Sequence, residues 1–307
     1  MSGEVAPSGA RPSFGSRLAR AFDEFGQLCV GIDPHPYLLG DWGLPVSAEG
    51  ARSFGLAVVE AVAGLVPIVK PQVAFFERYG SKGFAALEDV IQAARDARLL
   101  VIADAKRGDI GTTMDSYAQA WFDESSPLRA DAVTVAAYQG LGANAGFLRT
   151  ARETGGGVFV LAATSNPEAR DTQLARIDSG PRAGKTVAAG IVDDVLHDND
   201  AAADQDVSSG HPGAATRARS LDSIGLVLGA TVDLDDYGIR TRDLTSTPIL
   251  APGFGAQGAL YSDVARLYGE AAGSVLVSAS RSMVAAGRSG VAAAARQATE
   301  EVRTCLA

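Results

Sequence analysis

The stretch LLVIADAKRGDIGTT, residues 99–113, places an apolar strand directly before a dense cluster of charge. Residues 99–103 are all apolar and β-branched in the middle, which predicts a buried strand. Asp104 and Lys106 follow. Because side chains two apart in extended chain share a face, we expect this carboxylate and this ammonium to point the same way.

Asp109 follows three residues later, and we expect Asp104, Lys106 and Asp109 to lie close together at the carboxyl end of the strand. Gly111 frees the backbone for a turn, and we expect a helix to begin near Thr112 or Thr113. Charged groups at the carboxyl end of a strand lie where parallel α/β folds place their chemistry. A solvated rim with a salt bridge uses the same residue types, and Asp-x-Lys alone would favour that interpretation.

Length and charge limit the class of protein. The chain has 307 residues, 47% of them hydrophobic, which suits one α/β barrel or two small domains. A net charge of −9 disfavours binding to nucleic acid or to an anionic membrane. Two distant cysteines, Cys29 and Cys305, fit a reducing compartment. Without a long apolar stretch or a signal-like N-terminus, we expect a soluble cytoplasmic protein.

Apolar runs alternate with helical periodicity along the chain. Eight strands are predicted, at residues 28–32, 67–69, 99–103, 131–136, 158–162, 224–228, 248–251 and 275–278. Helices are predicted between them, at residues 14–25, 47–65, 84–94, 113–122, 141–153, 186–196, 259–271 and 290–305. This alternation predicts a (β/α)8 TIM barrel, and a doubly wound open sheet is the alternative.

The domain organisation follows from composition. Residues 1–13 are rich in Ser, Gly and Pro and are expected to be flexible, and residues 14–307 are expected to form a single (β/α)8 barrel domain. Residues 198–220 are small, polar and without period, which predicts a mobile insertion. His197 and His211 have no partners at ligand spacing, so we expect no metal site there.

A barrel brings the ends of all its strands to one mouth. The residues that could meet there are Asp33, Lys70, Asp104, Lys106, Ser165, Gln257 and Arg281. Taken singly, Asp33 is as well explained as a turn cap, and Ser165 as an ordinary turn residue. Lys70, between Val69 and Pro71, favours a functional role, although a snorkelling lysine would also fit.

The last two strands indicate the type of ligand. Residues 252–258, PGFGAQG, expose backbone N–H groups on glycines, and Arg281 follows the next strand. Barrels commonly bind phosphate with the loops after strands seven and eight. A Gly-rich loop alone is also typical of a tight turn, but together with the arginine it favours a phosphorylated ligand.

The string DAKRGDIGTT closely resembles the signature of the orotidine 5'-phosphate decarboxylase family, Asp-x-Lys-x-x-Asp-Ile-x-x-Thr. GIDP, VKPQVAFFERYG, ATSNP, PGFGAQG and SRS resemble further motifs of that family in the same order, over residues 28 to about 285, and favour its longer-chain subgroup. The resemblance implies decarboxylation of orotidine 5'-phosphate to uridine 5'-phosphate (UMP), the last step of pyrimidine nucleotide synthesis. It implies no metal and no organic cofactor.

The resemblance also implies roles for residues that match the motifs. Lys106 would donate the proton to C6 of the pyrimidine, Asp104 would lie beside the leaving carboxylate, and Lys70 would pair with Asp104 and the ribose. Asp109 and Thr113 would reach into the site of a neighbouring subunit, which implies a homodimer with shared active sites.

The remaining matches concern substrate binding. Asp33 would bind ribose hydroxyls, Ser165 would contact the pyrimidine, and Gln257 and Arg281 would hold the phosphate.

Two other functions fit parts of the pattern. A Mg²⁺-dependent sugar-phosphate decarboxylase or aldolase shares Asp-x-Lys-x-x-Asp, but such relatives carry an acidic metal ligand at the end of the second strand, where this chain has Lys70. A non-catalytic nucleotide-phosphate binder on a degenerate barrel is the other alternative. All motif positions here hold chemically competent residues, which favours the enzyme.

Overall fold

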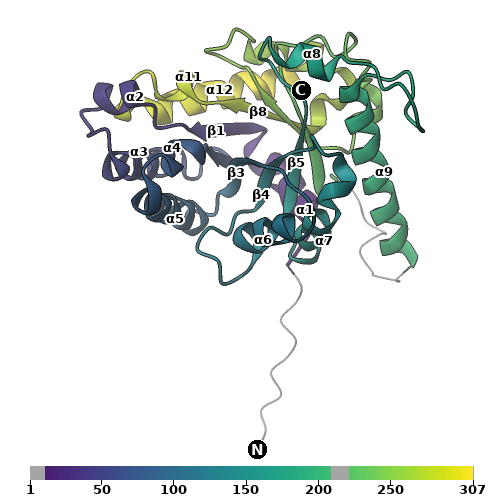
Figure 1. Cartoon of the computed structure of the whole chain (residues 1–307). Coiled ribbons are helices and arrows are strands. Elements are labelled where there is room, and N and C mark those ends of the chain that lie inside the picture. The colour runs from purple at the N-terminus through teal and green to yellow at the C-terminus, as the bar shows by residue number, and fades with distance from the viewer. Residues whose placement is uncertain (1–10, 209–220, 307) are drawn as a thin grey trace, which may run out of the picture.

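The computed structural model describes residues 11–208 and 221–306, and in these ranges eight parallel strands close into a barrel in chain order (Figure 1). β8 pairs with β1, which closes the sheet and excludes the doubly wound alternative. The (β/α)8 prediction is confirmed. The strands are β1 (Leu28–Ile32), β2 (Ile68–Pro71), β3 (Leu100–Arg107), β4 (Ala132–Ala136), β5 (Gly157–Ala163), β6 (Ile224–Leu228), β7 (Ile249–Pro252) and β8 (Val275–Ala279).

Helices surround the barrel and follow most of the predicted periodicity. The α-helices are α1 (Phe14–Phe25), α2 (Pro36–Asp41), α3 (Ala48–Val62), α4 (Ala74–Glu77), α5 (Gly80–Asp96), α6 (Gly111–Phe122), α7 (Ala145–Glu153), α8 (Ala169–Gln173), α9 (Val187–Ser208), α10 (Val264–Tyr268), α11 (Arg281–Val284) and α12 (Val291–Leu306). Five 3-10 turns join them, η1 (Leu141–Asn144), η2 (Thr241–Leu244), η3 (Tyr261–Asp263), η4 (Gly269–Ser274) and η5 (Arg288–Gly290). The helix predicted at 259–271 is broken into η3, α10 and η4.

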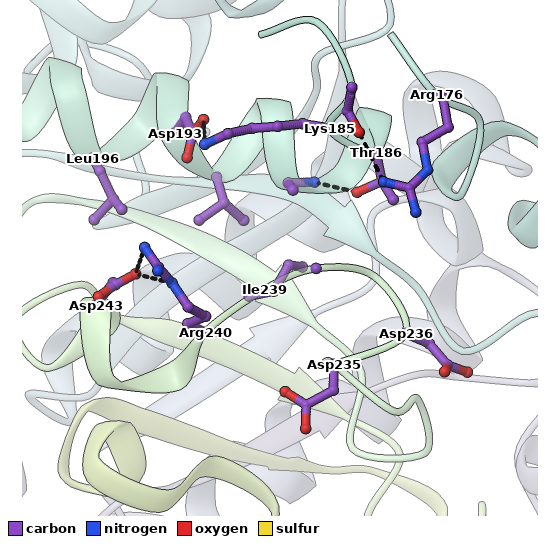
Figure 2. A pocket seen from close by; sticks show the side chains of 14 residues that line it. Arg176, Lys185, Thr186, Asp193, Leu196, Asp235, Asp236, Ile239, Arg240 and Asp243 are labelled. Carbon is purple, nitrogen blue, oxygen red and sulfur yellow. Dashed lines mark hydrogen bonds and ion pairs between the residues drawn. The ribbon is translucent and has the colours of Figure 1, made fainter.

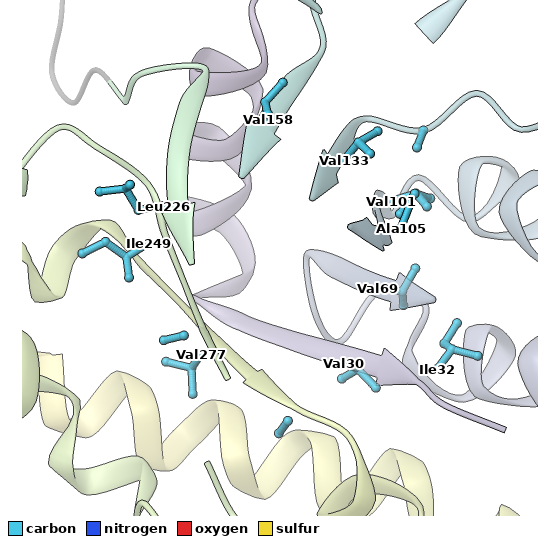
Figure 3. Packing of buried hydrophobic residues seen from close by; sticks show 14 of the residues in the cluster. Val30, Ile32, Val69, Val101, Ala105, Val133, Val158, Leu226, Ile249 and Val277 are labelled. Atoms are coloured by element: carbon cyan, nitrogen blue, oxygen red, sulfur yellow. The ribbon is translucent and has the colours of Figure 1, made fainter. Parts of the chain in front are cut away.

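Side chains alternate between the two faces of each strand. Val30, Val69 and Val277 lie on the outer face and pack in the layer between strands and helices (Figure 3). Ile68 and Ile102 lie on the inner face in a separate cluster within the barrel. This two-residue period decides which side chains reach the mouth, because every second residue continues along the interior.

α1 closes the amino-terminal end of the barrel. Phe14 packs edge-on against Phe159 of β5, with ring centroids 5.9 Å apart. A Cβ atom at Gly157 would lie 2.2 Å from the Phe14 ring, so only glycine allows the ring to lie this close to the strand. Arg17 forms an ion pair with the buried carboxylate of Asp131 beside this contact. With this end filled, the opposite end of the barrel is left for a ligand.

The expected domain boundaries are only partly covered by the described residues. α9 continues through Ser208, so residues 198–208 of the predicted insertion are helical. Residues 1–10 and 209–220 lie outside the described residues, and the expectations of flexibility at 1–13 and mobility at 198–220 stay predictions. Among the helices of the described ranges, none has the length and apolar character needed to cross a bilayer.

Phe14→Ala should lower the free energy of unfolding by about 3–5 kcal/mol, because it removes a fully buried ring and leaves a cavity under the barrel. Urea denaturation followed by far-UV circular dichroism measures this change. Arg20→Ala, at an exposed position of the same helix, serves as the control and should change stability by less than about 0.5 kcal/mol. A loss below about 1 kcal/mol for Phe14→Ala would show that α1 does not support the barrel.

Candidate active site

A cavity of about 420 Å³ opens at the carboxyl ends of the strands. Residues from all eight strands or from the loops that directly follow them line it, so its shape is set by the barrel itself. The predicted site residues that line it are Asp33, Lys70, Asp104, Lys106, Ser165, Gln257 and Arg281. The structure therefore brings together seven of the nine residues singled out from the sequence.

A second cavity, of about 380 Å³, lies beside α9 and the loop that follows β6 (Figure 2). Its cations already have partners within the chain. Lys185 forms an ion pair with Asp193, Arg240 lies 2.8 Å from the Asp243 carboxylate, and Arg176 donates a 2.7 Å hydrogen bond to a backbone carbonyl. Because Lys185 and Arg240 are paired with carboxylates and Arg176 is held by a carbonyl, the barrel mouth is the better candidate for binding a charged ligand.

Asp104 is the centre of the polar network at the barrel mouth. Its Oδ2 accepts a 2.9 Å hydrogen bond from Lys70 Nζ, and its Oδ1 accepts one of 2.6 Å from Lys106 Nζ. Thr134 Oγ1 donates a third, 2.9 Å long, to Oδ1. Asp104 and Lys70 are buried, whereas the side chain of Lys106 is 46% exposed and faces the opening.

Strand alternation explains how these groups meet. Ile102, Asp104 and Lys106 follow one another at every second position of β3, and Ile68 and Lys70 do the same on β2. In both strands the apolar residue lies deep in the barrel and the charged residues lie toward its mouth. The prediction that Asp104 and Lys106 share a face is therefore confirmed, although both lie within β3 rather than beyond its end.

Lys106 is held in an unusual backbone conformation. Its φ is +49°, in the left-handed region, and the pairing of β3 with β4 shifts register between Ala103 and Arg107. Instead of a strand partner, the Lys106 N–H donates a 3.0 Å hydrogen bond to Thr134 Oγ1. Such bulges redirect a side chain at a functional site. Here the bulge and Thr134 together fix where the ammonium points.

The two buried partners stabilise each other's charged state. Burial opposes ionisation of Asp104, but Lys70 and Lys106 outweigh it and hold the pKa of this carboxyl well below its ordinary 3.8. Burial likewise opposes the charge of Lys70, but Asp104 and Asp33 outweigh it and raise the pKa of this amine above 10.5. Near neutral pH the site therefore holds a carboxylate between two cations.

The loops after β7 and β8 form the other wall of the cavity. Gly253 and Gly255 have φ of +123° and +69°, values that favour glycine. A Cβ atom at Gly255 would lie 2.5 Å from Ser282 Oγ, so the loop also needs glycine to lie against α11. Exposed Arg281 begins that helix, and Gln257 Oε1 lies 3.5 Å from Ser165 Oγ across the mouth. This arrangement suits an anion that enters from solvent.

Asp33 lines the same cavity as the Asp104 network and Arg281. It follows β1 on the inner face of the barrel and lines the cavity. Its Oδ1 is buried and has no hydrogen-bond partner among the described residues. A buried carboxylate oxygen is costly to leave unpaired, which is consistent with a partner supplied by a ligand.

Asp109 and Thr113 are the two predicted residues that do not line the cavity. Asp109 Oδ1 accepts a 2.8 Å hydrogen bond from the N–H of Ile110, and Thr113 is exposed in the first turn of α6. Both lie on the outer rim beyond the end of β3. Within a single chain, they do not join the network around Asp104.

Several polar residues of the cavity were not among the candidate site residues chosen from the sequence, namely Gln72, Thr134, Thr164, Asn166, Ser278 and Ser280. Thr134 could have been found, because a lone hydroxyl in the alternating run of residues 131–136 occupies an inward position next to β3. Thr164 and Asn166 flank Ser165, and nothing in their residue types separates them from ordinary turn residues.

A family model and individual relatives of this chain point to the same protein family. The family model described as "Orotidine 5'-phosphate decarboxylase / HUMPS family" matches residues 26–297. A protein of Nocardioides sp. (strain ATCC BAA-499 / JS614) named orotidine 5'-phosphate decarboxylase is 47% identical over 268 residues, 87% of this chain and 90% of that protein. One of the same name from Salinispora tropica is 46% identical over 269 residues, 88% of each.

Solved structures agree with this result. A crystal structure from Streptomyces avermitilis is similar with a TM-score of 0.85 and 41% identity, covering 99% of both chains. The structure titled Leishmania donovani OMP decarboxylase has a TM-score of 0.71 and 27% identity, and the match covers 95% of this chain and 98% of that one. On the family match and the identity to these relatives, the chain belongs to the orotidine 5'-phosphate decarboxylase / HUMPS family.

Proposed function

We propose that this chain catalyses decarboxylation of orotidine 5'-phosphate to UMP and CO₂, the last step of pyrimidine nucleotide synthesis. Family membership supports this activity, and the observation that carries it is the network in which Lys70, Asp104 and Lys106 meet at the mouth of the barrel. The reaction needs an ammonium at the carbon that loses CO₂. Lys70 and Lys106 both pair with Asp104, but of the two only Lys106 is open to solvent.

The proposed chemistry uses the charge and the proton of Lys106. As the bond between C6 and the carboxylate carbon breaks, its electron pair stays on C6 and CO₂ departs. The ammonium stabilises this localised charge more than the delocalised carboxylate of the substrate, which is the differential binding that catalysis requires. An N–H proton of Lys106 then passes to C6, and the amine is reprotonated from water.

The contact between the Lys106 ammonium and the charge on C6 accounts for only part of the rate enhancement that enzymes provide. Two unit charges about 4 Å apart interact by roughly 4 kcal/mol at an effective dielectric constant near 20. Enzymes typically lower barriers by about 8–23 kcal/mol. We propose that binding energy from the phosphate end of the substrate supplies much of the difference by orienting the pyrimidine against Lys106.

The other residues of the cavity fit the rest of the substrate. We assign Arg281, Gln257 and the glycine N–H groups of residues 252–258 to the phosphate. The unpaired oxygen of Asp33 suits a ribose hydroxyl, and Ser165 suits the pyrimidine. Lys70 holds Asp104 in place and faces the ribose.

The metal-dependent alternative is disfavoured by charge at the site. A divalent cation beside Asp104 would have to lie next to Lys70 Nζ, which is 2.9 Å from the carboxylate and buried. Asp104 already pairs with both Lys70 and Lys106, so a divalent cation would add a third positive group to one buried carboxylate. We therefore propose a reaction that needs neither a metal nor an organic cofactor.

We further propose that the enzyme is a homodimer with shared active sites. Asp109 and Thr113 lie on the rim outside their own cavity, next to apolar side chains that face solvent. Ile110 is 60% exposed and Tyr138, after β4, is 88% exposed. A second copy placed on this rim would cover both side chains and receive Asp109 and Thr113. We also infer a cytoplasmic location, which is consistent with Cys29 and Cys305 both being free thiols.

The activity itself is tested with orotidine 5'-phosphate by following pyrimidine absorbance with and without EDTA. We expect turnover that EDTA does not change, and loss of turnover by at least about a thousandfold in Lys106→Ala, because proton donor and electrostatic stabilisation are lost together. UMP should still bind to this variant, as checked by calorimetry. Undiminished turnover in Lys106→Ala would refute the assignment, and loss of activity in EDTA would favour the metal-dependent alternative.

The ion pair predicts a pH dependence of stability. Asp104→Asn should lower the free energy of unfolding at pH 7 by about 3–5 kcal/mol, because Lys70 is left as a buried charge without this partner. Since the pKa of Asp104 is lower in the folded chain, its contribution is complete above the ordinary value of 3.8 and is lost as the pH falls through the folded value.

The difference between wild type and Asp104→Asn should therefore narrow below about pH 4 in urea titrations at a series of pH values. Asp41→Asn, at an exposed position, is the control and should show no such gap at any pH. A gap that stays constant down to about pH 2 would contradict the pairing.

Shared active sites predict complementation between two inactive variants. In a mixed dimer of Lys106→Ala and Asp109→Ala, one site carries both defects and the other carries neither. Co-expression at equal levels should therefore restore about a quarter of wild-type activity, since half of the dimers are mixed and each holds one intact site. If the mixture stays as inactive as either variant alone, each site is complete within one chain and the dimer proposal is wrong.

A further inference from the structure

α8 directly follows the loop that carries Ser165, and it lies outside the apolar core (Figure 1). None of its residues is buried. Hydrophobic packing therefore contributes little to its position relative to the cavity. What connects α8 to the cavity is the side chain of its last residue, Gln173, which is half-buried.

Gln173 makes two hydrogen bonds to one residue of the cavity wall. The backbone N–H of Thr164 donates to Gln173 Oε1 over 3.0 Å, and Gln173 Nε2 donates to Thr164 Oγ1 over 2.9 Å. Both polar ends of the amide are used, so the orientation of the side chain is defined by its partners. The pair closes a ring of hydrogen bonds between α8 and the end of β5.

The network continues past Ser165 to its other neighbour. Because Thr164 Oγ1 accepts from Gln173, its own proton is free to be donated, and it forms a 2.8 Å hydrogen bond to Asn166 Oδ1. The residues on both sides of Ser165 are thus fixed by one network that begins at Gln173. Ser165 itself points across the mouth, where its Oγ lies 3.5 Å from Gln257 Oε1.

We propose that Gln173 is a positioning residue for the reaction: through Thr164 it holds the hydroxyl of Ser165 where the pyrimidine ring of a ribonucleoside monophosphate binds. The inference rests on the proposed function and deepens it. A turn of Thr, Ser and Asn has many accessible conformations. Fixing it before the substrate arrives removes an ordering cost from binding.

The test compares Gln173→Leu with a matched control. Leucine keeps the size of the side chain and removes both hydrogen bonds to Thr164. We expect kcat/KM for orotidine 5'-phosphate to fall about tenfold, as for the loss of one to two net hydrogen bonds. Gln297→Leu, which removes an exposed glutamine that donates to Glu301 on α12, should leave kcat/KM unchanged.

Two further measurements separate positioning of Ser165 from general disturbance of the site. If Gln173 acts through Ser165, Gln173→Leu should cost less than about twofold in a Ser165→Ala background. Inhibition by inorganic phosphate, which probes the Arg281 side of the cavity, should be the same in wild type and Gln173→Leu. Inhibition by UMP, which also carries the pyrimidine, should weaken.

The outcomes are distinct. A tenfold loss in Gln173→Leu that repeats in full on top of Ser165→Ala, or weaker inhibition by phosphate as well as by UMP, would overturn the positioning role. So would a Gln173→Leu enzyme with wild-type kcat/KM. If wild type itself did not decarboxylate orotidine 5'-phosphate, the proposed function would fail and the inference with it, whereas an active wild type with an unaffected variant refutes the inference alone.

Discussion

The site depends on one carboxylate held between two ammonium groups. Asp104 accepts hydrogen bonds from Lys70, Lys106 and Thr134, and it is buried. A buried ion is tolerated only when such partners compensate its desolvation. The barrel provides them because β2, β3 and β4 are neighbours and direct every second side chain inward. The same arrangement that stabilises the charges therefore assembles the groups that would act on the substrate.

The members of this network differ in burial, and we infer different roles from that difference. Lys70 and Asp104 are locked in the barrel, so their mutual distance is set by the strands rather than by flexible side chains. Lys106 shares the carboxylate but keeps about half of its side chain open to the cavity. We interpret Asp104 as the group that orients the Lys106 ammonium. The left-handed backbone at Lys106 is a local strain that this orientation requires.

Much of this could be predicted from the sequence, and the limits have physical causes. Continuous apolar runs identified most of the strands, and the two-residue repeat of side chains along a strand predicted the shared face of Asp104 and Lys106. The bulge in β3 and the role of Thr134 depend on the register between β3 and β4, which no local pattern encodes. The proposed role of Gln173 depends on its hydrogen bonds to Thr164, nine residues earlier, and no local sequence pattern predicts these bonds. Thr113 was singled out only through the family resemblance and Asp109 also through its place in the charged cluster, and the partner of both is expected on another chain.

The most direct test of the account is a crystal structure of the protein with UMP bound. We predict the pyrimidine ring against Lys106, with Nζ about 3–3.5 Å from C6, the phosphate at Arg281 and Asp104 still paired with Lys70. A structure in which Lys106 Nζ points away from the ring, or in which UMP binds outside the barrel mouth, would contradict the central claim that this ammonium is the proton donor.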